Sequence, residues 1–356
     1  MNPTHGTPPS EPAEAAQPGE LTELTPPTNT TAPAPRPRAH ARPRTRGASV
    51  LTLAGALSAL AAALALTLAA AALGARLAAW DTGELRIPAA GTTSVLRTAL
   101  FGALAVVIGE RAGVRFAGAG PLPGSWSRPA ALVGAAAAAG QIAVLAAVNG
   151  LDLATAAYAS REGRLLLLTA NGLLAVAACV PRRPRLALAP LAVAILAESL
   201  RAHPEPYTPE IGTALTVVHL TAASLWCGGL LYALRVMAAR RRDGTGALAV
   251  LGRYARTAVW PLLALTATGT ASTLRRLPTD VVLTSAYGRV LIAKLVLVAV
   301  VCALAFAARR AMLRGRFAAR STAWRELAVL ALVLLVSALL TVVPDPHWIS
   351  TRLSLR

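Results

Sequence analysis

Charged residues are scarce in this chain of 356 residues: only 14% are Asp, Glu, Lys or Arg, whereas 55% are hydrophobic. A soluble protein carries about 25% charged residues. The low charge therefore excludes an ordinary soluble protein and favours one that lies largely in a lipid bilayer. Aromatic residues are also rare, at 4%, and no basic patch is interleaved with stacking rings. We therefore expect no binding to nucleic acid.

The sequence also lacks the patterns of several other classes. Cys179, Cys227 and Cys302 show no CxxC spacing, so we expect neither a disulfide framework nor a zinc site. The chain has only three methionines and therefore no Met-rich site for monovalent copper. No phosphate-binding loop, nucleophile elbow or HExxH motif occurs. These absences exclude an ATP-driven pump within this chain, and we expect that the protein is not an enzyme.

Long apolar runs take the place of these patterns and recur from Ser49 onward. We predict an all-α polytopic transmembrane helical bundle of about nine spans, because each run is long enough to cross a bilayer as a helix. A disordered, Pro/Arg-rich cytoplasmic tail over residues 1–47 precedes it. The predicted spans are 49–78, 94–112, 129–148, 164–181, 186–201, 211–236, 255–274, 287–308 and 324–343.

The loops between these runs alternate in charge. Arginines gather in the tail and in every second loop, whereas the other loops hold most of the acidic residues. Because positive loops stay inside, we predict a bacterial cytoplasmic-membrane protein with its N-terminus inside and its C-terminus outside. The predicted regions are a five-span N-terminal membrane region (48–201), a four-span domain (202–346) and a short extracytoplasmic tail (347–356).

The sixth predicted span contains a histidine, His219, and a tryptophan, Trp226, seven residues apart. This spacing is about two helical turns, so both lie on one face, with Ser224 nearby. An ionisable side chain at membrane depth is costly and is a functional candidate by default. Gly228 and Gly229 allow a neighbouring backbone to come close. A neutral histidine that simply forms a hydrogen bond between helices is the alternative.

Three histidines lie outside the tail, namely His203, His219 and His347, and all fall toward the outer side of the predicted topology. Imidazole suits Cu(II) and other late transition metals. We therefore predict that these three histidines are metal ligands of an outer site. The alternative is that they are loop histidines placed there by chance. The carboxylates that could complete such a site are Glu205, Glu210 and Asp345.

Lys294, the only lysine of the chain, lies one to two turns inside the eighth predicted span, seven residues after Tyr287. The two residues share a helical face. Tyr287 suits an interfacial anchor. For Lys294, snorkelling to the outer surface, pairing within the bundle and a role in a pathway all stay open.

Taken together, these residues resemble the copper-resistance D (CopD-like) membrane family over roughly His203 to Pro344. The resemblance rests on the outer-loop histidine, on the stretch from His219 to the Trp-x-Gly-Gly signature, and on the Thr268-Gly269 pair. It also rests on the signature that contains Tyr287, Gly288, Arg289 and Lys294.

The resemblance implies passage of copper across the cytoplasmic membrane, often alongside a small extracytoplasmic copper-binding protein. It also implies that His203 and His219 contact copper while Trp226 and the glycines shape the helix packing beside them.

We therefore predict copper transport or copper tolerance, with a copper ion transported or transiently bound. Import is the expected direction, because the membrane potential drives cations inward. A scaffold that delivers copper without transporting it is one alternative. A b-type haem electron-transfer protein is another, but it needs paired axial histidines on facing spans, and only His219 lies within a span.

Overall fold

The structure is a computed structural model that describes residues 67–82, 87–202, 208–240, 245–277, 281–314 and 318–343. In these ranges every regular element is a helix, which confirms the predicted all-α fold. A short apolar helix, Thr67–Ala78, comes first. The others are α2 (Ala90–Ala117), α3 (Ser127–Asn149), α4 (Leu153–Tyr158), α5 (Arg161–Cys179), α6 (Leu188–Ala202), α7 (Pro209–Ala239), α8 (Thr245–Thr257), α9 (Val259–Arg276), α10 (Ala286–Leu313) and α11 (Ala318–Leu340).

Six of the described helices are long and apolar enough to cross a membrane: α2, α3, α5, α7, α10 and residues 321–340 of α11. A polytopic membrane fold is therefore confirmed, whereas the count of nine spans is not. Helix α6 has only 15 residues. The predicted span 255–274 is divided between α8 and α9, and α9 contains several threonines that lower its hydropathy. The tail and most of the first predicted span lie outside the described residues.

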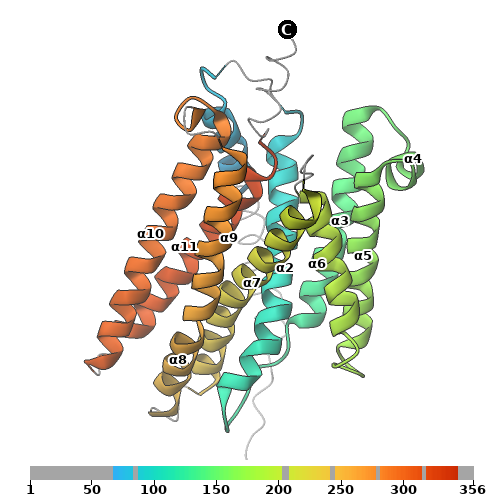
Figure 1. Cartoon of the computed structure of the whole chain (residues 1–356). Coiled ribbons are helices and arrows are strands. Elements are labelled where there is room, and N and C mark those ends of the chain that lie inside the picture. Colours follow the sequence, from blue (N-terminus) through green and yellow to red (C-terminus); the bar gives the residue numbers. More distant parts are fainter. Residues whose placement is uncertain are drawn as a thin grey trace, which may run out of the picture. The chain divides into compact units, whose positions relative to one another are not determined.

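The long helices alternate in direction, so their connections gather at two ends of the bundle (Figure 1). The "α8 end" holds α8, the link from α2 to α3, the link from α5 to α6 and the end of α10. The "α4 end" holds α4, the link from α9 to α10 and the end of α11. The predicted arginine-rich loops with described residues all belong to the α8 end. Which end faces the cytoplasm stays a prediction.

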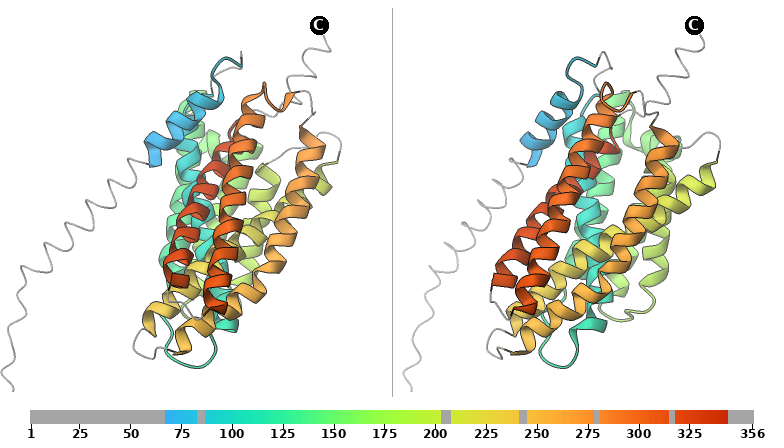
Figure 2. Two further views of the ribbon diagram at one scale, coloured as in Figure 1. Left: turned by 90° about the vertical axis from the view of Figure 1, so that its left-hand side faces the viewer. Right: turned by 60° about the vertical axis from the view of Figure 1, so that its left-hand side comes forward.

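Helices α2 and α7 form the most extensive contact in the bundle, and they cross at two glycines. A Cβ atom built on Gly228 of α7 would lie 1.7 Å from the Ala105 carbonyl oxygen of α2. A Cβ on Gly109 would lie 2.1 Å from the Gly228 backbone. The two backbones therefore touch directly, as small residues allow between membrane helices. Around this crossing, α7 packs beside α9, and α10 packs beside α11 (Figures 1 and 2).

Polar groups complete the helix ends where the backbone lacks partners. At the C-terminus of α2, the guanidinium groups of Arg240 and Arg253 donate to the Ala117 carbonyl at 2.9 and 2.8 Å. The Asp152 carboxylate caps α4 by accepting from the hydroxyl and amide of Thr155 at 2.6 and 2.9 Å. These hydrogen bonds hold the pKa of Asp152 below its ordinary value.

Candidate functional site

A cavity of about 450 Å³ lies among α7, α9, α10 and α11, with one residue each from α2 and α6 at its wall. His219, Trp226, Tyr287 and Lys294 all line it. The two pairs of residues spaced seven apart, one on α7 and one on α10, thus line the same cavity. Its hydroxyl-bearing lining residues are Thr216, Ser224, Thr266, Thr270, Ser272, Thr273, Tyr287, Ser337 and Thr341.

The imidazole of His219 is held by a threonine of the facing helix α9. Its Nδ1 atom lies 2.9 Å from Thr268 Oγ1. The Thr268 hydroxyl itself lies 2.6 Å from the Ala264 carbonyl oxygen, to which it donates its only proton. Thr268 must therefore accept from His219, so Nδ1 carries the proton and Nε2 keeps its lone pair. This arrangement orients a histidine for metal binding through Nε2.

The residue after Thr268 leaves room for the same imidazole. A Cβ atom on Gly269 would lie 3.7 Å from His219 Cε1, with no other atom within 4 Å. The Thr268-Gly269 pair thus provides a hydrogen-bond acceptor and open space at adjacent positions of α9. Together the two residues define both the orientation of the ring and the free space next to it.

Lys294 contributes a positive charge to the same cavity. It lies close enough to His219 for its charge to act on the imidazole. Within the described ranges its ammonium group forms no ion pair or hydrogen bond, so the pairing considered from the sequence is not observed there. The ammonium group therefore remains available to a molecule in the cavity.

Trp226 lies on the side of the cavity that faces the α8 end, and it forms hydrogen bonds with residues of two further helices. Its side chain is hydrogen-bonded to the carboxyl group of Glu326 on α11. Its carbonyl accepts from the Tyr254 hydroxyl of α8 at 2.9 Å. Glu326 is only 4% exposed. Helices α7, α8 and α11 are therefore joined by polar contacts directly beneath the cavity.

At the α4 end, an ion-pair group stands beside the cavity. The Arg201 guanidinium contacts both carboxylate oxygens of Glu198, at 2.8 and 2.9 Å, and Glu162 at 3.2 Å. Two carboxylates thus compensate this arginine, which immediately precedes the histidine loop. Arg97 of α2 is buried nearby and donates to the Thr341 carbonyl at the end of α11 at 2.8 Å.

The remaining predicted motif residues shape the packing near the start of α10. Ser285 caps this helix by accepting from the Gly288 amide at 3.1 Å. A Cβ on Gly288 would lie 1.9 Å from the Val282 carbonyl oxygen. Arg289 donates to the Trp80 carbonyl, which ties α10 to the segment after the Thr67–Ala78 helix. On α7, Gly229 faces the Tyr254 ring, 3.1 Å from its would-be Cβ.

His203 and His347 lie outside the described residues, so their convergence with His219 stays a prediction. The part of the chain that the structure describes contains no group of three His, Cys, Asp or Glu side chains that could hold a metal ion. If His219 binds a metal ion, no further pair of such side chains in this part completes the site. A metal ion bound there would keep positions open for small ligands or for residues outside the described ranges.

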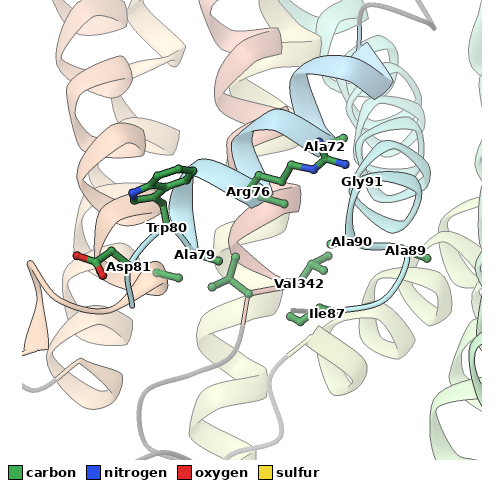
Figure 3. A pocket seen from close by; sticks show the side chains of 13 residues that line it. Ala72, Arg76, Ala79, Trp80, Asp81, Ile87, Ala89, Ala90, Gly91 and Val342 are labelled. Atoms are coloured by element: carbon green, nitrogen blue, oxygen red, sulfur yellow. The ribbon is translucent and has the colours of Figure 1, made fainter. Parts of the chain in front are cut away.

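A second cavity, of about 910 Å³, lies at the α4 end between the Thr67–Ala78 helix, the start of α2 and the end of α11. Figure 3 shows Arg76 extending along it toward Gly91, with Trp80 and Asp81 at the other side. Its described lining residues include no histidine or cysteine, and most are small or apolar. The cavity beside His219 is therefore the candidate site.

Comparison with known families bears on this region of the bundle. Residues 248–343 match the family model of CopD, Copper resistance protein D. The resemblance inferred from the sequence is thereby confirmed over residues 248–343, in the C-terminal part of the chain. No curated protein and no solved structure matches the chain.

The CopD match (residues 248–343) covers three walls of the cavity, because it includes all of α9, α10 and α11. Thr268, Gly269, Tyr287 and Lys294 fall inside it. His219 precedes it, on α7, and reaches it through the hydrogen bond to Thr268. Thr268, inside the matched region, thus orients His219, which lies outside it.

The sequence indicated the Thr268-Gly269 pair as a motif but not that Thr268 is the hydrogen-bond partner of His219. Glu326 was overlooked, although it is an acid directly followed by the long apolar run of the last span. An acid in that position is costly unless a partner such as the Trp226 indole compensates it.

Proposed function

We propose that this protein passes copper ions across the cytoplasmic membrane and that His219 is the ligand that receives them in the cavity. The observation that supports this most is the hydrogen bond from His219 Nδ1 to Thr268, because it leaves the Nε2 lone pair free. Imidazole in this state is a natural ligand for Cu(II). His203 and His347 are proposed as further ligands on the outer side.

Import is the proposed direction, with the N-terminus inside and the α4 end facing outward. An inside-negative membrane potential favours inward movement of a cation by about 2.3 kcal/mol per charge for each 100 mV. On this orientation His219 lies about a third of the way along α7 from its outer end and is reached from outside through the cavity. A small extracytoplasmic copper-binding protein is the proposed donor.

The test is cell-associated copper, at fixed external copper, in bacteria that express the wild type or His219→Ala at matched membrane levels. The matched control is Thr216→Val, because Thr216 also lines the cavity from α7 but bonds only within its own helix, to the Gly212 carbonyl at 2.8 Å. We expect higher accumulation with the wild type and Thr216→Val, and none above empty cells with His219→Ala.

Other outcomes contradict specific parts of the proposal. Lower accumulation with the wild type than with empty cells would reverse the direction but keep the metal. Equal copper in all four strains would rule out transport and leave the delivery scaffold. Full accumulation with His219→Ala would remove the histidine from the pathway. His203→Ala and His347→Ala, measured in the same assay, test the outer ligands separately.

A further inference from the structure

The charges that line the cavity are mostly positive. Lys294 contributes an ammonium group with no partner among the described residues. Arg276 also lines the wall, but its guanidinium group has a partner of its own. The one carboxylate at the wall, Glu198, is occupied by its two-oxygen contact with Arg201. The cavity therefore presents the uncompensated positive charge of Lys294 to a molecule that enters it.

A bare copper ion is a poor occupant of such a space. Lys294 and His219 line the same cavity, so the Lys294 ammonium group would repel a copper ion bound to Nε2 of His219. Repulsion between like charges strengthens as the dielectric constant falls, and that constant is lower in a cavity walled by protein than in bulk water. An anion that accompanies copper removes the conflict, because it is attracted by Lys294 and lowers the net charge of the metal.

The size and the walls of the cavity also fit more than an ion. Its volume of about 450 Å³ lies in the range of small-molecule pockets. Along α9, Thr270 and Thr273 lie three residues apart, so they share a helical face, and both line one wall of the cavity. Their hydroxyl groups can donate to carboxylate oxygens. A small carboxylate ligand thus finds both a cation and hydrogen-bond donors.

We propose, on the basis of the proposed function, that the cavity takes copper as an anionic complex with a small carboxylate ligand. The carboxylate lies against Lys294 and the threonine wall of α9. Copper exchanges one bound water for the Nε2 lone pair of His219. No electron is transferred in this exchange, and the Nδ1 proton stays on its hydrogen bond to Thr268.

The experiment measures radioactive copper uptake into proteoliposomes that contain the full chain, at matched free copper. Copper is supplied as an anionic complex with citrate, a neutral complex with glycinate or a cationic complex with ethylenediamine. We expect uptake from the citrate complex to be about fivefold faster than from the cationic one, since steering by charge changes association by this order or more. Lys294→Gln removes the preference, and Lys294→Arg retains it.

The outcomes separate this inference from the proposed function. Equal uptake from all three complexes, or an unchanged preference in Lys294→Gln, overturns the anionic complex but leaves copper transport intact. No uptake of any complex by the wild type overturns both. Thermal unfolding of each variant in detergent shows whether it is folded. Copper citrate should also raise the unfolding temperature of the wild type and of Lys294→Arg but not that of Lys294→Gln, a readout that does not depend on transport.

Discussion

The hydroxyl group of Thr268 on α9 accepts a hydrogen bond from His219 Nδ1 on α7 across 2.9 Å, and so decides which imidazole nitrogen is free. Partners of this kind change metal affinity by about 10–100-fold when they are removed. We expect Thr268→Val to raise the copper concentration for half-maximal uptake by about tenfold, and Thr268→Ser to restore it.

The control for this prediction is Thr266→Val. Thr266 lines the same cavity, but its hydroxyl donates to the Leu262 carbonyl of its own helix at 2.9 Å. It should therefore leave copper uptake near the wild-type value. Equal losses from Thr266→Val and Thr268→Val would mean that cavity polarity matters and the orientation of His219 does not.

The crossing of α2 and α7 predicts a large loss of stability from one methyl group. Gly228→Ala places a Cβ 1.7 Å from the Ala105 carbonyl oxygen, so the two helices must separate. Overpacking of this kind costs about 1–3 kcal/mol or more. Gly102→Ala on α2 is the control, because no atom lies within 4 Å of its Cβ. Thermal unfolding in detergent should separate the two variants, and similar stabilities would show that the helices shift apart freely.

A buried ion pair near the α8 end joins α2 to α7. The Arg235 guanidinium donates to Glu110, and the two side chains are only 9% and 8% exposed. Glu110 also accepts from the Ser127 amide at 2.9 Å, which ties in the start of α3. Removing either partner leaves a buried charge, so we expect Arg235→Met and Glu110→Gln each to destabilise by about 3 kcal/mol.

The double variant tests whether that cost comes from the pair. Because the second substitution removes the charge that the first one leaves behind, Arg235→Met with Glu110→Gln should cost less than the sum of the singles. Equilibrium unfolding of the wild type, the two single variants and the double variant gives the four free energies of unfolding that this double-mutant cycle needs. Additive losses would show that the two groups act independently.

The hydrogen bond between the Trp226 side chain and Glu326 predicts a difference between two tryptophans. Trp226→Phe keeps an aromatic ring but removes the donor, so the buried carboxyl group loses its partner. We expect a loss of about 1–3 kcal/mol. Trp260→Phe is the control, because Trp260 is 73% exposed. Stability measured by chemical unfolding should fall only for Trp226→Phe, and Trp226→Phe in a Glu326→Gln background should cost less.

Much of the fold could be predicted because it depends on local pattern. Apolar runs of sufficient length predict spans, and six helices of the described chain meet that condition. The predicted spans at α6 and α9 are not among these six helices, because α6 is short and α9 contains several threonines. Packing against neighbouring helices, rather than hydropathy, determines where such segments begin and end.

For the site, spacing alone placed His219 with Trp226 and Tyr287 with Lys294 on common faces, because the helical period relates residues seven apart. The tertiary structure decided that both faces open onto one cavity, that Thr268 holds His219, and that Glu326 meets Trp226. These partners come from other helices, 49 residues away in the case of Thr268. Which side chains meet depends on the rotation and crossing of packed helices, and no spacing within one helix determines these.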